Sequence, residues 1–314
     1  MSLPGLVSVV IPCFNAAGTL EKAVRSALDN GPLVHEIILV DNVSTDGTLD
    51  LCMELQESIG NKILVSKEPL PGACYARNKG LRLVKTEWVQ FLDADDWISP
   101  EKLRLQVAFA HERAIDVVVS PFELIDRDGN RTRSTCPELP AEMGLMRGCL
   151  GTTGANLFRT SLVRAVNGWN PNWSSAQEYE LMFRLSTNGA KFGVCKEALF
   201  EYSSGVVGSI SSGNSFKLKT NSLNLRRNML EYFLRQDWSR KERQALMNGL
   251  FLQVRWALFI NPTLALENWS YLRGLNYWPT CDRNLPLSYC VLIRIFGLNF
   301  TESLRKSYQK LKND

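Results

Sequence analysis

Three carboxylates lie close together in the segment Asp93-Ala94-Asp95-Asp96, directly after the apolar run Trp88 to Leu92. Like charges at this spacing repel one another and destabilise a fold unless a cation lies between them. Mg²⁺ and Mn²⁺ prefer carboxylate oxygens combined with phosphate oxygens as ligands. The pattern therefore favours a site for a divalent cation and a phosphorylated ligand, with a solvated acidic turn as the alternative.

Three other side chains have chemistry that suits a nucleotide or a proton transfer. Asp41 could accept a hydrogen bond from a nucleobase or a ribose, although capping of a loop explains it equally well. Arg77, at the start of a predicted helix, offers a planar fork suited to a phosphate or a base carbonyl. Glu178 could remove a proton from a hydroxyl, and the alternative is a carboxylate that stabilises a helix N-terminus.

The elements that must position these residues are predicted from periodicity. Apolar runs predict strands over 7–11, 36–41, 62–66, 88–93 and 117–125. Amphipathic stretches between them predict helices over 20–28, after Asp46, over 76–84 and from Ser99-Pro100 onwards. Alternating strands and helices predict a mostly parallel sheet with helices on both faces. Ligands of such sheets bind beyond the carboxyl ends of the strands, where Asp41 and Asp93 are expected.

Composition narrows the class of protein. The 314 residues are 45% hydrophobic and 22% charged, which is typical of a globular chain. A net charge of +4 without any long basic run argues against a nucleic-acid partner. Eight cysteines without a Cys-x-x-Cys pair favour neither a zinc site nor disulfides. With no visible signal peptide or membrane span, the expected location is the cytoplasm.

The character of the chain changes near residue 215, where strand alternation gives way to amphipathic segments rich in Arg, Leu and Trp. We therefore expect an α/β domain over residues 1–214 and a helical C-terminal subdomain over residues 215–314. The segment Leu285 to Lys312 combines apolar and basic residues. It suits an interfacial membrane helix, although packing within the subdomain is the favoured interpretation.

Taken in order, these segments resemble the family 2 glycosyltransferases, which have the GT-A fold. The resemblance covers residues 5–212, and the matching stretches are 7–15, 38–41, 44–48, 72–80, 91–96 and 177–184. It implies a Rossmann-like nucleotide-diphospho-sugar transferase fold with a mostly parallel sheet. It also implies inverting transfer of a sugar, from a UDP- or dTDP-sugar by preference, to a hydroxyl acceptor. That acceptor would be a glycan or a lipid-linked glycan in cell-surface polysaccharide assembly, reached from the inner face of the membrane.

The resemblance also assigns roles to single residues. It places the metal, Mn²⁺ or Mg²⁺, at Asp95 with Asp96 nearby, and it makes Glu178 the catalytic base. The nucleotide would be bound by Pro12, Phe14 and Asn15 in the loop after the first strand, and by Asp41, Arg77 and Asp93.

Three departures from the family pattern accompany the resemblance. Gln177-Glu178 stands where relatives carry Glu-Asp, and Asn42 replaces the second Asp of a usual pair. The segment Tyr202 to Ser211 lacks a His that binds metal or phosphate in relatives, which leaves Ser209 and Ser211 as candidate phosphate contacts. The alternative function is accordingly a nucleotide-sugar-binding protein with a degenerate site.

Overall fold

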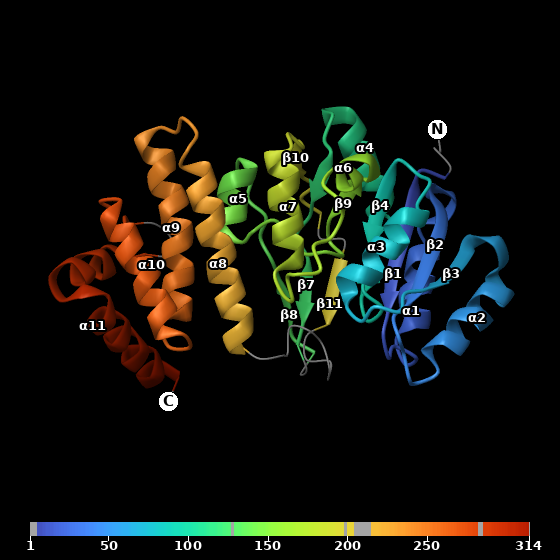
Figure 1. The fold of residues 1–314 in the computed structure, drawn as a ribbon, viewed down its shortest axis with the longest axis horizontal. Helices are drawn as coiled ribbons and strands as arrows, with labels where there is room; N and C mark the ends of the chain where they lie inside the picture. Colours follow the sequence, from blue (N-terminus) through green and yellow to red (C-terminus); the bar gives the residue numbers. More distant parts are fainter. Residues whose placement is uncertain (1–4, 127–128, 198–199, 204–214, 282–284, 314) are drawn as a thin grey trace. The chain divides into compact units, whose positions relative to one another are not determined.

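The structure is a computed structural model that describes residues 5–126, 129–197, 200–203, 215–281 and 285–313. The chain divides into two compact units, Met1–Gly213 and Asn214–Asp314 (Figure 1). The first unit is an α/β domain, and the second is helical (Figure 1).

The first unit is organised around a seven-stranded sheet with the strand order β10-β6-β9-β4-β1-β2-β3. Strand β9 runs antiparallel to both of its neighbours, and the other strands pair in parallel. The mostly parallel sheet expected from the sequence is therefore confirmed. Its strands are β1 (Val7–Cys13), β2 (Val34–Asp41), β3 (Ile63–Lys67), β4 (Trp88–Phe91), β6 (Val117–Val119), β9 (Leu157–Arg159) and β10 (Phe192–Val194).

A second, four-stranded sheet has the order β5-β11-β7-β8. The single strand expected over residues 117–125 is wrong, because this segment forms β6 and β7, which belong to different sheets. Pro121 lies between them and has no N–H to donate to a strand ladder, which explains the break. The strands of this sheet are β5 (Trp97–Ile98), β7 (Glu123–Ile125), β8 (Arg131–Arg133) and β11 (Phe200–Ser203).

Helices bury both faces of the large sheet. Side chains alternate along β1, so Val9 and Ile11 lie in a core shared with α1, α2 and α4, whereas Val10 faces α3. Burial on both faces explains why the strands are continuous apolar runs. The helices are α1 (Leu20–Leu28), α2 (Thr48–Ile59), α3 (Ala73–Leu83), α4 (Lys102–Arg113), α5 (Ala141–Arg147), α6 (Thr160–Ala165) and α7 (Gln177–Thr187).

Two predicted helix starts differ from the structure. Helix α4 begins at Lys102 with Glu101 as its N-cap, because Ser99 and Pro100 belong to the preceding turn. Asp46 does not occupy the N-cap of α2, which is Gly47 in the left-handed region at φ 83°. Asp46 instead accepts hydrogen bonds from the Thr48 backbone N–H and from the Ala17 N–H, and so joins the α2 start to the loop after β1.

The described residues of the second unit form four helices, α8 (Ser215–Phe233), α9 (Arg240–Ala257), α10 (Pro262–Gly274) and α11 (Leu287–Asn313). Ser239 and Glu242 form a capping box at the start of α9, and Asn261 caps α10 ahead of Pro262. Phe251 lies at the centre of its core, with ring contacts to Trp269, Tyr277 and Tyr289. Among the described residues, no helix combines the length and apolar character needed to cross a bilayer.

Gly80 allows α3, the helix that carries Arg77, to lie directly against β1. A Cβ atom at this position would lie 2.3 Å from Val10 Cγ1, well inside van der Waals contact. We predict that Gly80→Ala lowers the free energy of unfolding by about 1–2 kcal/mol, since overpacking outweighs the better helix propensity of alanine. Urea denaturation measures the change. Gly18→Ala is the matched control, because its Cβ meets nothing within 4 Å, and equal stability of both variants would contradict the packing argument.

Candidate active site

The carboxyl ends of three adjacent parallel strands bring the predicted residues to one edge of the sheet. The register pairs Cys13 at the end of β1 with Asp41 at the end of β2. It also pairs Val10 with Phe91 at the end of β4, so Asp93 follows on the same edge. The structure therefore brings the loop after β1, Asp41 and the acidic turn together, as the strand-end rule requires.

Arg77 is the buried cation of this edge, with a side chain only 6% exposed. Its Nη2 donates to Asp93 Oδ1 at 2.7 Å, and its Nη1 donates to Gln177 Oε1 at 3.0 Å. Its guanidinium carbon lies 4.6 Å from the centre of the Trp169 ring, in cation–π geometry. Burial would lower the pKa of Arg77, but the charge and hydrogen bond of Asp93 outweigh it and hold the pKa above its ordinary value.

The segment that leads into α3 is held by Asn42. Its Nδ2 donates to the carbonyls of Glu68 and Leu70 at 2.9 and 2.7 Å, and its Oδ1 accepts from the Gly72 N–H at 2.7 Å. An aspartate could not donate to the two carbonyls. The departure from the family pattern at Asn42 thus has a structural consequence, because this side chain fixes the turn before α3, the helix that carries Arg77.

Asp41 is 6% exposed, and its Oδ1 is buried without a hydrogen-bond partner among the described residues. A buried carboxylate oxygen without a donor is costly, so this atom suits the N–H group of a ligand. The neighbouring Cys13 is also buried, and its pKa is raised by a hydrogen bond with Cys52, by burial and by the charge of Asp41. Its thiol therefore stays protonated, and the neutral side chain gives Asp41 an apolar neighbour.

The loop after β1 is stabilised by the segment around residue 46. Asn15 has a positive φ of 48°, and its Oδ1 accepts from the Thr45 N–H at 2.8 Å. The Ala16 N–H donates to Thr48 Oγ1 at 2.7 Å. Phe14 is left 61% exposed beside the strand edge, and Pro12 is half-buried. An exposed aromatic ring in a fixed loop offers a flat apolar surface to a ligand.

The acidic turn contains carboxylates with different environments. Asp93 pairs with Arg77, and its backbone carbonyl accepts from the Asp96 N–H at 3.1 Å. Asp96 is buried, and Asp95 is half-buried. Burial and the charge of Asp93 raise the pKa of Asp95, and among the described residues no cation forms an ion pair with it.

The described residues contain no group of three or more His, Cys, Asp or Glu side chains placed to hold a metal ion. A divalent cation at this turn would therefore take one or two carboxylates and complete its shell with oxygens of a ligand. Mg²⁺ and similar ions bind in this way beside substrate phosphates. The uncompensated carboxylate of Asp95 fits such an ion.

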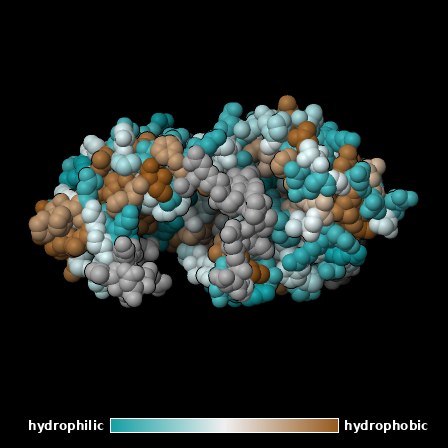
Figure 2. All heavy atoms as spheres, turned by 90° about the horizontal axis from the view of Figure 1, so that it is seen from below, coloured by the Kyte–Doolittle hydropathy of each residue, from teal (hydrophilic) through white to brown (hydrophobic). Residues whose placement is uncertain are grey.

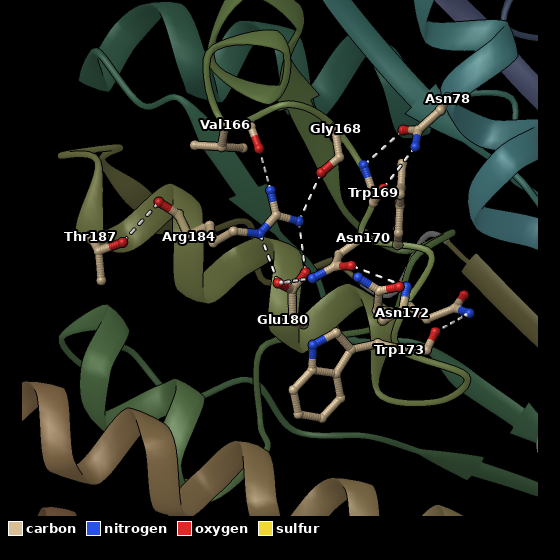
Figure 3. Close-up of polar contacts among 11 residues, drawn as sticks. Asn78, Val166, Gly168, Trp169, Asn170, Asn172, Trp173, Glu180, Arg184 and Thr187 are labelled. Carbon is tan, nitrogen blue, oxygen red and sulfur yellow. Dashed lines mark hydrogen bonds and ion pairs between the residues drawn. The ribbon is translucent and has the colours of Figure 1, made fainter.

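The segment before α7 is tied to α3 and α7 by the contacts drawn in Figure 3. Asn78 forms two hydrogen bonds with the Trp169 backbone, donating to its carbonyl at 2.7 Å and accepting from its N–H at 2.8 Å. Arg184 pairs with both carboxylate oxygens of Glu180 and donates to the carbonyls of Val166 and Gly168 (Figure 3). These contacts hold Trp169 over Arg77.

The polar residues in the first turn of α7 have different partners and different roles. Gln177 donates to the Trp173 carbonyl at 2.9 Å and accepts from Arg77, so it is a bridge between α7 and α3. Glu180 is buried in its pair with Arg184. Glu178 is half-buried, and its charge also raises the pKa of Arg77, so the two side chains lie within electrostatic range. Of the two glutamates in this turn, Glu180 pairs with Arg184, and Glu178 is the one whose charge acts on Arg77.

Sequence reasoning missed Asn42, Asn78 and Trp169 as parts of this site. Their side chains act on backbone atoms or on Arg77 from segments distant in sequence, and nothing in local spacing signals such contacts. Ser209 and Ser211, the candidate phosphate contacts, lie outside the described residues.

The two glutamates of α7 are predicted to differ in their effect on stability. Glu180→Gln should lower the free energy of unfolding by about 2 kcal/mol, because it removes one partner of a largely buried ion pair. Glu178→Gln should change it by less than about 1 kcal/mol, since Glu178 is only half-buried and the charge it loses is screened by solvent. Thermal and urea unfolding of both variants test this. A larger loss in Glu178→Gln would show that Glu178, too, is structural.

Comparisons with known proteins identify the family of the chain. The sequence profile of glycosyl transferase family 2 matches residues 8–168. TuaG of Bacillus subtilis (strain 168), named for teichuronic acid biosynthesis, is 39% identical over 125 residues, which are 40% of this chain and 49% of TuaG. The Escherichia coli glucosyltransferase WfgD is 28% identical over 159 residues, which are 50% of this chain and 62% of WfgD. The chain thus spans less than two thirds of either relative.

Solved structures establish the fold. The crystal structure of S. aureus TarS 1-349 in complex with UDP-GlcNAc has a TM-score of 0.69 at 19% identity, over 97% of this chain and 92% of that one. The mannosyltransferase PcManGT from Pyrobaculum calidifontis, in complex with GDP-Man and Mn²⁺, has a TM-score of 0.59 at 16% identity, over 87% and 76%. These neighbours confirm the GT-A fold expected from the resemblance. Because the family profile covers just over half of the 314 residues, the chain belongs to glycosyl transferase family 2.

Proposed function

We propose that this protein is a metal-dependent, inverting glycosyltransferase that moves a sugar from a UDP- or dTDP-sugar to a hydroxyl acceptor. The observation that carries the proposal is the hydrogen-bonded chain Asp93–Arg77–Gln177. It joins the acidic turn after β4 to the first turn of α7, although Arg77 and Gln177 are 100 residues apart. This connection supports a single site that contains both the residues proposed for the donor diphosphate and the proposed base.

Asp41 is proposed to select the base. Uracil and thymine present a ring N–H that the unpartnered Asp41 Oδ1 can accept, whereas cytosine presents a bare ring nitrogen that a carboxylate repels. Guanine also presents ring and amino N–H groups, so the titration below includes it. Phe14 and Pro12 would pack on the base, with Asn15 holding their loop. Asp93, already oriented by Arg77, would face the ribose.

Asp95 is proposed to hold Mn²⁺ or Mg²⁺ with Asp96 nearby. When bound there, the ion neutralises the charge that develops on the departing nucleoside diphosphate. Arg77 adds a positive charge at the same edge, and its hydrogen bonds to Asp93 and Gln177 fix its position. Two of its guanidinium nitrogens bind Asp93 and Gln177. Arg77 would therefore stabilise the charge on the diphosphate through its fixed electrostatic field as well as through direct contact.

Glu178 is proposed as the general base. Its carboxylate takes the proton of the acceptor hydroxyl while that oxygen forms a bond to the anomeric carbon. The bond from this carbon to the diphosphate oxygen breaks in the same displacement, so the configuration inverts. One carboxylate suffices, because the diphosphate leaves readily once its charge is neutralised. Gln177 holds the first turn of α7 at the Trp173 carbonyl and at Arg77, which fixes where Glu178 emerges.

The names of the relatives support a proposal for the acceptor class. TuaG is named for teichuronic acid biosynthesis, and WfgD for transfer of glucose to a sugar on diphosphoundecaprenol. We assign this chain, by analogy, to the assembly of a cell-surface polysaccharide on a glycan or lipid-linked glycan acceptor, in the cytoplasm.

The first prediction concerns the donor. Calorimetric titration with UDP, TDP, GDP and CDP should show that UDP or TDP binds more tightly with Mn²⁺ than without it, and that GDP and CDP bind weakly. Asp95→Asn should remove the effect of Mn²⁺, because it removes the charged ligand. Asp41→Asn should weaken UDP binding by about tenfold and narrow the preference for UDP over CDP, since an amide can also donate to cytosine. An unchanged UDP-to-CDP ratio in Asp41→Asn would contradict the assignment of Asp41.

The second prediction concerns transfer. Glu178→Gln should bind UDP like the parent protein but lose at least about 100-fold in turnover, the usual contribution of a general base. UDP release from a panel of UDP-sugars, with glycoside acceptors and with water alone, measures turnover. Wild-type activity in Glu178→Gln would remove Glu178 from the mechanism. A parent protein that binds UDP but never releases it from any UDP-sugar would instead be a binding protein.

A further inference from the structure

Charge is divided unequally between the two units. Residues 214–314 contain 16 Lys and Arg against 7 Asp and Glu, a net charge of +9. Residues 1–213 contain 20 against 25, a net charge of −5. The small net charge of the whole chain therefore hides a strongly basic helical unit. Such an asymmetry indicates that this unit meets an anionic surface or polymer.

The last helix of this unit exposes a row of large apolar side chains, here called the α11 stripe. Their exposed fractions range from 46% to 67%, and they recur every four residues on either side of a kink at Gly297, where φ is 77°. The α11 stripe consists of Leu287, Val291, Ile295, Phe296, Phe300, Leu304 and Tyr308. Figure 2 shows hydrophobic residues gathered on the helical unit at the end where Figure 1 draws α11. A patch of this kind is uncommon on a protein surface that meets only water.

The opposite side of α11 is anchored, so the outward direction of the stripe is fixed. Glu302 is fully buried, and it accepts hydrogen bonds from Tyr289 Oη at 2.6 Å and from Arg305 Nε at 2.8 Å. Arg255 of α9 forms an ion pair with the same carboxylate and lies 4.3 Å from the Tyr289 ring centre. A buried carboxylate with these partners resists rotation of the helix, because any rotation would leave charges unpaired.

Basic side chains accompany the stripe. Helix α11 contains five Lys and Arg residues but only one acidic residue, the buried Glu302, so no carboxylate of α11 faces outward with the stripe. Arg294 is exposed beside Ile295. Lys306 is exposed, and its Nζ lies 4.5 Å from the ring centre of Phe259, which is itself 43% exposed. Phe259 thus extends the apolar surface on the second unit beyond α11.

We propose that the α11 stripe is an interfacial docking surface for an anionic lipid bilayer. Its apolar side chains would enter the boundary between headgroups and acyl chains, and its basic side chains would pair with headgroup phosphates. This arrangement of an apolar row with lysine and arginine beside it is typical of helices that lie in a membrane plane.

Two other occupants are disfavoured by the charges on the same unit. A second copy would bring its own +9 unit against the first across a symmetric contact, which repels. A soluble polyanion would pair with the basic residues but would leave the seven apolar side chains in water. The inference does not depend on the proposed transferase activity, although docking at a bilayer would place the protein beside a lipid-linked acceptor.

The test is co-sedimentation of the full chain with vesicles, without nucleotide or metal. The protein should bind vesicles of phosphatidylcholine and phosphatidylglycerol, bind pure phosphatidylcholine weakly, and lose binding as salt is raised. Ile295→Asp combined with Phe300→Asp should weaken binding by about tenfold or more. Met53→Asp, at an apolar residue 52% exposed on α2 of the first unit, is the matched control and should bind normally. Thermal unfolding checks that each variant is folded.

A second measurement keeps the proposal testable if the double variant does not fold. The fluorescence of the tryptophan added in Phe300→Trp should be quenched by brominated lipids in anionic vesicles, and that of the tryptophan added in Met53→Trp should not. Equal binding of neutral and anionic vesicles, or normal binding by the double variant, would overturn the proposal. Two other results would overturn the proposal if the protein does not bind vesicles. One is a dimer in sedimentation velocity that the double variant abolishes, and the other is retention of the protein on heparin. Because no donor is present, none of these results depends on catalysis.

Discussion

A buried guanidinium is stable only when its charge is balanced, and Arg77 has three partners from three segments. Asp93 supplies the charge, Gln177 an amide oxygen, and Trp169 an aromatic face. Its Nε is buried without a hydrogen-bond partner among the described residues, so removing any one of the three would leave still more of the cation unmatched. The positions of the acidic turn, the first turn of α7 and the loop before it therefore depend on one another through this single side chain.

The supports of Arg77 explain why residues without reactive groups matter to the site. Asn42 fixes the turn before α3, Gly80 lets α3 lie on β1, and Asn78 holds the backbone of Trp169 (Figure 3). The ion pair of Glu180 and Arg184 holds the segment before α7 that contains Trp169. A preorganised positive charge is useful where negative charge develops, because no reorganisation is needed during the reaction. Several buried polar groups of the fold thus serve to orient one guanidinium, that of Arg77.

Much of the fold and of the strand-end residues could be predicted from the sequence, because parallel strands buried on both faces give continuous apolar runs. Asp41 and the acidic turn follow such runs directly. The break at Pro121 was missed because the apolar pattern continues across it, and only pairing in space assigns the two halves to different sheets. The Asn42 and Asn78 contacts could not be predicted, since they join side chains to backbone atoms of distant segments. The exposure of the α11 stripe likewise needed the structure, because periodicity alone does not tell a buried apolar face from an outward one.

The central claim is that the edge around Arg77 binds a nucleoside diphosphate and a divalent cation together. Anomalous X-ray diffraction from crystals grown with UDP and Mn²⁺ tests it most directly. The account predicts a manganese peak between the Asp95 carboxylate and the diphosphate, with the uracil ring nitrogen against Asp41 and the Arg77–Asp93 pair intact. A manganese peak away from residues 93–96, or a uracil bound elsewhere, would contradict it.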